Sequence, residues 1–219
     1  MAVPAYLTKL LSNRPDMESH YGPLKLECRK IGDLHLPSGR IVACDIMMSG
    51  DSLAFKQTVP PGSYPVYLSD VHLPEEDDEA TAAAWIRFAP AAPVRWEFAR
   101  WDSRKQVKEP AYIVDSGMGS FMSLEAAPLV DEAGEPLTDQ VYAAMDKEPY
   151  RDWVVLTVPG AEHLNFAVFS PGRGDGVYAS YWGYDGNGNP VCLLTDCDML
   201  GLDDTGADPA PGKPWWKFW

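Results

Sequence analysis

The chain has 219 residues and a formal net charge of −14 at pH 7, with 46% hydrophobic and 23% charged residues. This length is enough for a hydrophobic core, and the composition is that of a globular protein, which excludes wholesale disorder. The negative charge disfavours nucleic acid and anionic membranes as partners, because both are themselves negatively charged. A basic protein or a cation remains compatible with it, although an acidic surface also simply keeps a protein soluble.

The four cysteines are Cys28, Cys44, Cys192 and Cys197, and none belongs to a C-x-x-C pair or lies at metal-ligand spacing from a histidine. They are expected to be reduced, buried thiols, with no metal and no cofactor bound. The first residues lack a basic stretch followed by an apolar run, and no apolar stretch approaches the roughly 18 residues that cross a membrane. A cytoplasmic location is therefore predicted.

Taken in chain order, most of the sequence predicts β-structure, because short apolar runs alternate with turns rich in Gly and Pro. The predicted strands cover residues 24–29, 34–36, 40–44, 64–68, 82–88, 94–101, 112–114, 153–158, 164–170, 177–184 and 191–195. Three pairs of these are expected to form hairpins, through turns at 37–39, 90–93 and 185–189.

Two short helices are predicted, at residues 4–12 and 138–147, the second capped by Thr138 or Asp139. The expected fold class is therefore mainly β (α+β), with antiparallel sheets that form a sandwich or a partly open barrel. Residues 1–200 are expected to form a single globular β-rich domain. Residues 201–219 are rich in Asp, Gly and Pro, and this composition predicts a flexible tail. Its terminal aromatic cluster could dock on a partner or on its own domain.

One motif suggests a hydrolase. Two apolar residues followed by Asp115-Ser116-Gly117 match the local signature of an aspartic protease strand, in which a second nearby Asp shares one proton. The similar string at 203–206 lies in the predicted tail, without a strand to hold it. The simpler interpretation is that the Asp115 carboxylate accepts N–H bonds in the 117–119 turn.

Two glycine-rich loops have weaker functional interpretations. Residues 171–176 could expose N–H groups to an anion, but a strand follows them where a nucleotide loop needs a helix. Residues 185–189, with Asp196, resemble a calcium loop, but Pro190 stands where that loop needs Gly. Both segments are therefore expected to be tight turns.

Several strings in a fixed order resemble a bacterial family of unknown function, the domain of unknown function 4241. The resemblance covers roughly residues 20–200 and is carried by residues 39–45, 61–66, 96–99, 112–121 and 174–178. One departure is Ile46, where the family pattern has Pro after Cys-Asp, and this weakens the expectation of a role for that turn. The resemblance implies no activity, but it implies a setting among bacterial toxin and immunity genes, as for some members.

These observations favour a protein-binding module, specifically an immunity-type inhibitor that neutralises a basic toxin domain. The expected contact residues are an acidic loop and exposed aromatic side chains: Glu75, Glu76, Asp77, Asp78, Glu79, Tyr181, Trp182 and Tyr184. The alternative is a hydrolytic enzyme in which Asp115 and Asp175, with Glu97, act as carboxylates in a shared cleft. A third possibility is a structural module without a small-molecule site.

Overall fold

The computed structural model describes residues 3–19, 22–73, 78–103, 110–147 and 151–201. Its strands are β1 (Arg14–Met17), β2 (Leu24–Leu36), β3 (Ile41–Asp45), β4 (Gly62–Leu73), β5 (Asp78–Arg87), β6 (Arg95–Phe98), β7 (Ala111–Val114), β8 (Gly119–Ser123), β9 (Trp153–Val158), β10 (Ala161–Phe169), β11 (Gly176–Tyr184) and β12 (Pro190–Asp196). Its helical elements are the α-helix α1 (Ala127–Met145) and the 3-10 segments η1 (Leu7–Leu11) and η2 (Ile46–Met48).

The strands form two sheets in which every ladder is antiparallel. The larger sheet has the order β1-β2-β4-β5-β12-β11-β6, and β7 also pairs with β11. The smaller sheet has the order β3-β8-β10-β9. The last hairpin of the chain, β11 and β12, lies inside the larger sheet, because β12 pairs with β5 and β11 pairs with β6.

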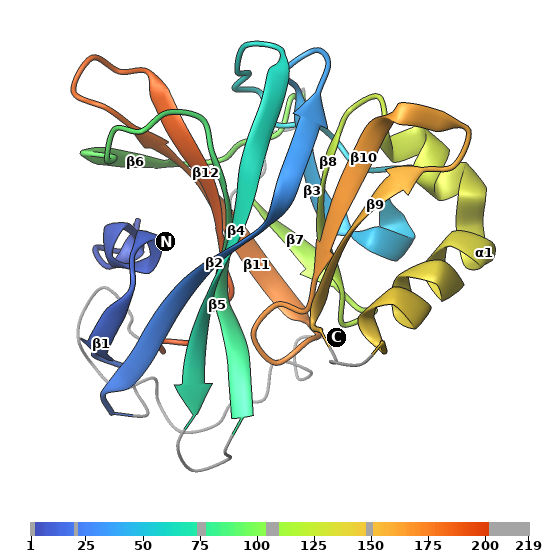
Figure 1. The fold of residues 1–219 in the computed structure, drawn as a ribbon. Helices are drawn as coiled ribbons and strands as arrows, with labels where there is room; N and C mark the ends of the chain where they lie inside the picture. The colour runs from blue at the N-terminus through green and yellow to red at the C-terminus, as the bar shows by residue number, and fades with distance from the viewer. Residues whose placement is uncertain (1–2, 20–21, 74–77, 104–109, 148–150, 202–219) are drawn as a thin grey trace.

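The two sheets pack as layers (Figure 1). Three apolar cores lie between and beside them. The central core lies between the two sheets and includes Leu68 and Phe121. A second core lies between the smaller sheet and α1 and includes Phe166 and Val141. On the far face of the larger sheet, a third core is covered by the first residues and η1, including Leu7. Because α1 and η1 cover the two outer faces, strands such as β3, β8 and β12 are buried along almost their whole length, whereas β2 largely alternates between buried and exposed residues.

The predicted fold class is confirmed, since the protein is mostly β with antiparallel sheets that do not close into a barrel. The predicted 185–189 hairpin is also confirmed, because β11 and β12 pair directly. The Asp185 carboxylate holds this turn by accepting hydrogen bonds from Asn187 N and Asn189 N at 2.9 and 2.8 Å.

The predicted hairpin around residues 37–39 is wrong. β2 pairs with β1 and β4 in the larger sheet, whereas β3 pairs with β8 in the smaller one. The turn between them therefore carries the chain from one sheet to the other. Gly39 makes this possible, because it adopts φ +71° and Val59 N donates a hydrogen bond to its carbonyl at 3.0 Å.

The predicted pairing of 82–88 with 94–101 is also wrong. β5 pairs with β4 and β12, and β6 pairs with β11. The later hairpin β11–β12 is inserted between β5 and β6 in the larger sheet. Sequence neighbours that look like a hairpin are therefore separated by two strands.

The helices differ from their predicted form. The first is the 3-10 segment η1, and the second begins eleven residues earlier than predicted, at Ala127. Gly134 interrupts α1 with φ 54° and ψ −144°, and Pro136 follows it, so the first half is hidden from a search for helical periodicity. Thr138 lies inside α1 and does not cap it; its hydroxyl donates to Gly134 O at 3.4 Å.

No helix within the described ranges is both long enough and apolar enough to span a membrane. The four cysteines carry free thiols, and three of them are buried. Of the predicted tail, only Gly201 belongs to the described residues, so the terminal aromatic cluster lies outside them.

We expect Gly39→Ala to cost about 3 kcal/mol or more of unfolding free energy, from a left-handed alanine and a forced overlap. A Cβ at this position would lie 1.7 Å from Val59 O. The matched control is Gly160→Ala, with φ +75° but nothing within 4 Å of the new Cβ, so it should cost only about 1–2 kcal/mol. Urea denaturation measures both, and equal losses would contradict the crowded-turn explanation.

Candidate protein-binding face

Asp45 organises one edge of the molecule. It ends β3 with a side chain that is only 2% exposed. Its Oδ2 accepts hydrogen bonds from Asp115 N and Ser116 N, both at 2.8 Å, and its Oδ1 accepts from Met47 N at 2.8 Å and Ser116 Oγ at 2.7 Å. One buried carboxylate thus fixes both η2 and the turn that follows β7. The turn after Cys44-Asp45 therefore has a structural role, despite Ile46.

Asp175 supports the same turn from the other side. Its Oδ1 accepts a hydrogen bond from Gly117 N at 2.9 Å, and Ser170 Oγ donates to Gly117 O at 3.2 Å. Asp115 is exposed. The interpretation that its carboxylate binds N–H groups of the 117–119 turn finds no support, because the Gly117 N–H goes to Asp175 and the Asp115 main-chain N–H goes to Asp45.

The structure brings Asp115 and Asp175 to neighbouring strand ends but leaves Glu97 far from both. Val114 is the register partner of Gly176, so the two aspartates each lie one residue beyond the same end of the β7–β11 ladder. Glu97 is the partner of Trp182 and ion-pairs with Arg95. Gly176 and Trp182 are six residues apart along β11, which corresponds to about 20 Å. The three carboxylates therefore do not share one cleft.

A groove of about 430 Å³ lies between this turn and the second half of α1. Its lining residues are Ser116, Gly117, Met118, Tyr142, Ala143, Met145, Asp146 and Ser170. Met118 and Met145 are buried, which makes the inner wall apolar, whereas Asp146 is exposed at the end of the helix. The groove can therefore hold a side chain with an apolar stem and a positively charged end.

Exposed apolar side chains lie on η2 and on α1, and one of them, Tyr142, lines the groove. Met47 and Met48 of η2 are 57% and 56% exposed, and Tyr142 of α1 is 48% exposed. η2 packs against α1, and Gly50 N donates to Asp131 Oδ1 at 3.1 Å, which attaches the segment after η2 to the helix. Large exposed apolar side chains gathered on one side of a domain are typical of a protein-binding surface.

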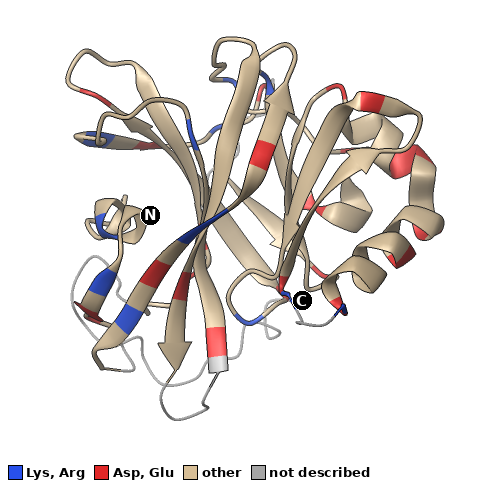
Figure 2. Cartoon of the chain, viewed as in Figure 1, with Lys and Arg blue, Asp and Glu red and all other residues tan. Residues whose placement is uncertain are grey.

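The outer surface of α1 is acidic. Glu132, Glu135 and Asp139 are exposed along it, between Asp131 and Asp146. Figure 2 shows this concentration of acidic residues on the helix. We call the exposed side of α1, together with η2 and the groove, the α1 face. Sequence reasoning missed it, although the acids alternate with Val130, Leu137 and Val141 at helical spacing.

The contact residues predicted from the sequence fall into two groups in the structure. Residues 75–77 of the acidic loop lie outside the described residues, while Asp78 and Glu79 begin β5. The expected exposure of Tyr181, Trp182 and Tyr184 is wrong, since all three are buried. β11 is an interior strand of the larger sheet with a core on each face, so none of its central side chains reaches a partner.

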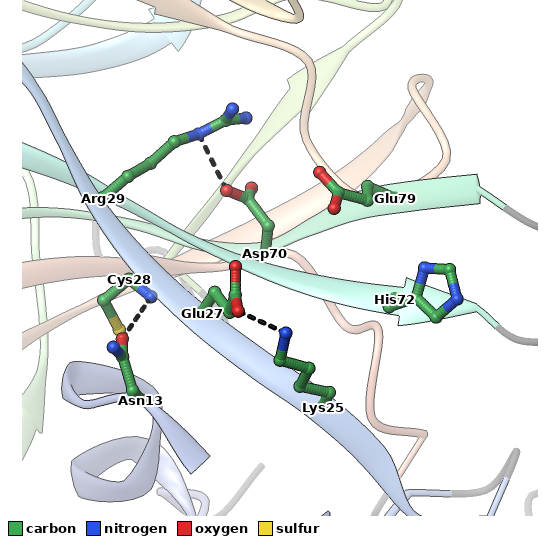
Figure 3. Close-up of a pocket in the computed structure, with 8 residues that line it drawn as sticks. All are labelled: Asn13, Lys25, Glu27, Cys28, Arg29, Asp70, His72 and Glu79. Carbon is green, nitrogen blue, oxygen red and sulfur yellow. Dashed lines mark hydrogen bonds and ion pairs between the residues drawn. The ribbon is translucent and has the colours of Figure 1, made fainter. Parts of the chain in front are cut away.

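A second hollow, of about 430 Å³, opens where the larger sheet extends beyond the smaller one (Figure 3). It is lined by Asn13, Lys25, Glu27, Cys28, Arg29, Asp70, His72 and Glu79. Lys25 Nζ lies 2.5 Å from Glu27 Oε1, and Arg29 Nε lies 2.9 Å from Asp70 Oδ2. These opposite charges largely neutralise each other within the hollow.

Arg29 also joins the two sheets at this hollow. Its Nη2 lies 2.7 Å from Asp152 Oδ1, just before β9 of the smaller sheet. Asp70, on β4, receives a further hydrogen bond from Thr81 Oγ1 at 3.0 Å. Burial raises the pKa of Asp70 to about 7, the charge of Arg29 opposes this rise, and Asp152 adds to it. Asp70 can therefore exchange a proton near neutral pH, although both of its oxygens already have partners.

These features define a two-sheet antiparallel β-domain with an acidic helical face beside a groove. The chain belongs to the family described as "Protein of unknown function (DUF4241)", whose model matches residues 34–195. The expected family is thereby confirmed. Neither a search of curated proteins nor a search of solved structures found a match.

We expect Asp45→Asn to lower the free energy of unfolding by about 2–3 kcal/mol, because an amide cannot accept all four hydrogen bonds of the buried carboxylate. Asp175→Asn should cost about 1 kcal/mol, since it weakens one exposed hydrogen bond. Asp115→Asn is the matched control and should change stability by less than about 0.5 kcal/mol. Chemical denaturation measures all three, and a larger loss in Asp115→Asn than in Asp45→Asn would contradict this order.

Stability should fall as pH rises from about 4 to 7. Burial raises the pKa of Asp70 to about 7 and of Asp196 to about 6, so between these values and the ordinary aspartate pKa the folded protein holds protons that the unfolded chain releases. Each unit of pKa difference corresponds to about 1.4 kcal/mol.

Asp70→Asn removes the Asp70 carboxyl group, and with it one of the protons that the folded protein holds and the unfolded chain releases. The stability advantage of the unaltered protein over the variant should therefore shrink steadily between pH 4 and pH 7, as measured by urea denaturation in a pH series. A difference between the two proteins that is independent of pH would show that Asp70 titrates normally.

Proposed function

We propose that this domain is a protein-binding module that acts as an immunity-type inhibitor, binding a basic toxin domain through the α1 face. The observation that carries the proposal is the combination of exposed acids on α1 with exposed apolar residues, namely Tyr142 at the groove and Met47 and Met48 on η2, which packs against α1. The setting implied by the family resemblance supports the same function.

Each part of the α1 face has a different physical task. The acids attract a basic partner over about 8–10 Å at physiological salt, which mainly accelerates association. The exposed Tyr142 and methionines supply apolar contact area that slows dissociation. The groove receives a lysine or arginine of the partner, with its stem along Met118 and Met145 and its charge near Asp146.

A hydrolytic function through Asp115 and Asp175 draws less support. Asp175 already accepts a hydrogen bond from Gly117 N, and Glu97 lies at a distant part of β11. These contacts favour a positioning role for Asp175, which holds one wall of the groove.

The test co-expresses this protein with the product of a neighbouring reading frame that encodes a basic domain, and purifies the two together. Glu132→Gln with Glu135→Gln should slow association by about threefold or more at low salt and flatten its salt dependence, with little change in dissociation. The matched control is Asp16→Asn with Glu18→Gln, which removes the same charge at and beside β1, on the opposite side of the molecule (Figure 1). Surface plasmon resonance gives both rates.

Tyr142→Ala tests the apolar part of the α1 face. Because the side chain is half exposed and borders the groove, its removal should accelerate dissociation by about tenfold while association changes little. Failure of the neighbouring product to bind, or equal effects of the α1 and β1 variants, would overturn the proposal.

A further inference from the structure

A third hollow lies on the far face of the larger sheet, away from the α1 face. It has a volume of about 260 Å³. η1 and the residues after it form one wall, and the loop between β5 and β6 forms the other. It is lined by Thr8, Leu11, Ser12, Arg14, Trp85, Arg87, Ala89, Pro90, Ala91, Ala92, Pro93, Val191 and Cys192. Among the described residues, the lining thus combines apolar side chains with two arginines and includes no acidic residue.

Among the residues that the structure describes, the partners of the two arginines are main-chain carbonyls. Arg87 donates from Nε to Ala89 O at 3.1 Å and from Nη2 to Pro90 O at 2.9 Å, and Arg14 donates from Nε to Lys9 O at 3.1 Å. Within the described ranges neither guanidinium has an ion pair. In a chain with a net charge of −14, two half-buried cations that share one hollow without a carboxylate leave a vacancy for an anionic group.

The apolar walls are preformed. Trp85 is buried and stacks on Tyr67, with ring centroids 4.2 Å apart. The loop between β5 and β6 is held to the sheet because Phe88 N donates to Val191 O at 2.8 Å. The Arg87 bonds to the loop carbonyls stiffen it further. The hollow therefore needs little rearrangement to receive a ligand.

We propose that this hollow, which we name the arginine hollow, binds an acidic peptide segment of a partner protein. A carboxylate of the peptide accepts hydrogen bonds from Arg14 and Arg87, and an adjacent apolar side chain covers Trp85 and the prolines. The positive charges of Arg14 and Arg87 favour a peptide that carries an acidic side chain. The volume of 260 Å³ selects a peptide side chain over a free ligand, since small-molecule sites usually span about 300–1,000 Å³.

The arginine hollow is independent of the proposed inhibitor function, because it faces the opposite side of the larger sheet and takes the opposite charge. The test is a selection from a random 12-residue peptide library displayed on phage, run against the intact protein and against Arg14→Gln with Arg87→Gln. A second variant, Ala92→Glu, adds a carboxylate at an exposed rim position without removing any buried contact. Lys56→Gln is the control, since it removes an exposed positive charge outside the hollow.

Selection on the intact protein should enrich peptides that place Asp or Glu beside an apolar residue. Their dissociation constants should rise about tenfold or more in both hollow variants and stay unchanged in Lys56→Gln, and amides in place of the acids should have the same effect as the hollow variants. The proposal is overturned if no peptide is enriched, if the enriched peptides lack acids, or if Ala92→Glu binds them as tightly as the intact protein. Equal binding of free 3-phenylpropionate would overturn it too, because a small-molecule carboxylate site would explain that result.

Discussion

The two sheets are held together by an apolar core, but three polar contacts at its border determine how they meet. Asp45, at the end of β3 in the smaller sheet, binds the turn that follows β7 of the larger sheet. Arg29 of β2 reaches Asp152 beside β9. Asn165 of β10 accepts from His35 N and donates to Asp33 O, both on β2. Apolar packing between sheets tolerates sliding, whereas hydrogen bonds of fixed geometry do not. The contact between the two sheets therefore determines the shape of the groove.

The α1 face depends on this border more than on the helix alone. Asp45 and Asp175 hold the turn that lines one side of the groove, and the second half of α1 forms the other side. Asp175, a candidate catalytic carboxylate in the sequence, thus positions a main chain, as Asp45 does. These contacts make the groove rigid, and an ordered groove loses little conformational entropy when a partner side chain enters.

Local patterns in the sequence predicted the class of fold and the β11–β12 hairpin, because alternation and turn chemistry act over a few residues. They failed where the structure depends on distant segments. Gly39 predicts a turn, but only its approach to Val59 turns the chain into the second sheet. Gly134 and Pro136 hid the first half of α1. Tyr181 and Trp182 belong to a strand pattern that reads equally as exposed or as buried, and the burial follows from the interior place of β11 in the sheet order. The role of Asp45 in joining the two sheets had no local signal, since Asp115 and Ser116, which it binds there, lie about seventy residues away.

The place of β12 in the larger sheet bears on how the protein is made. β12 lies between β5 and β11, so the edge of β5 has no partner until residues 190–196 have left the ribosome. Tyr6, which precedes β1, donates to the buried Asp196 carboxylate at 2.6 Å, so this hydrogen bond forms only after β12 has been synthesised. An unpaired strand edge attracts other chains. The larger sheet is therefore completed only after β12 has been synthesised, and the nascent protein must keep the edge of β5 from other chains until then.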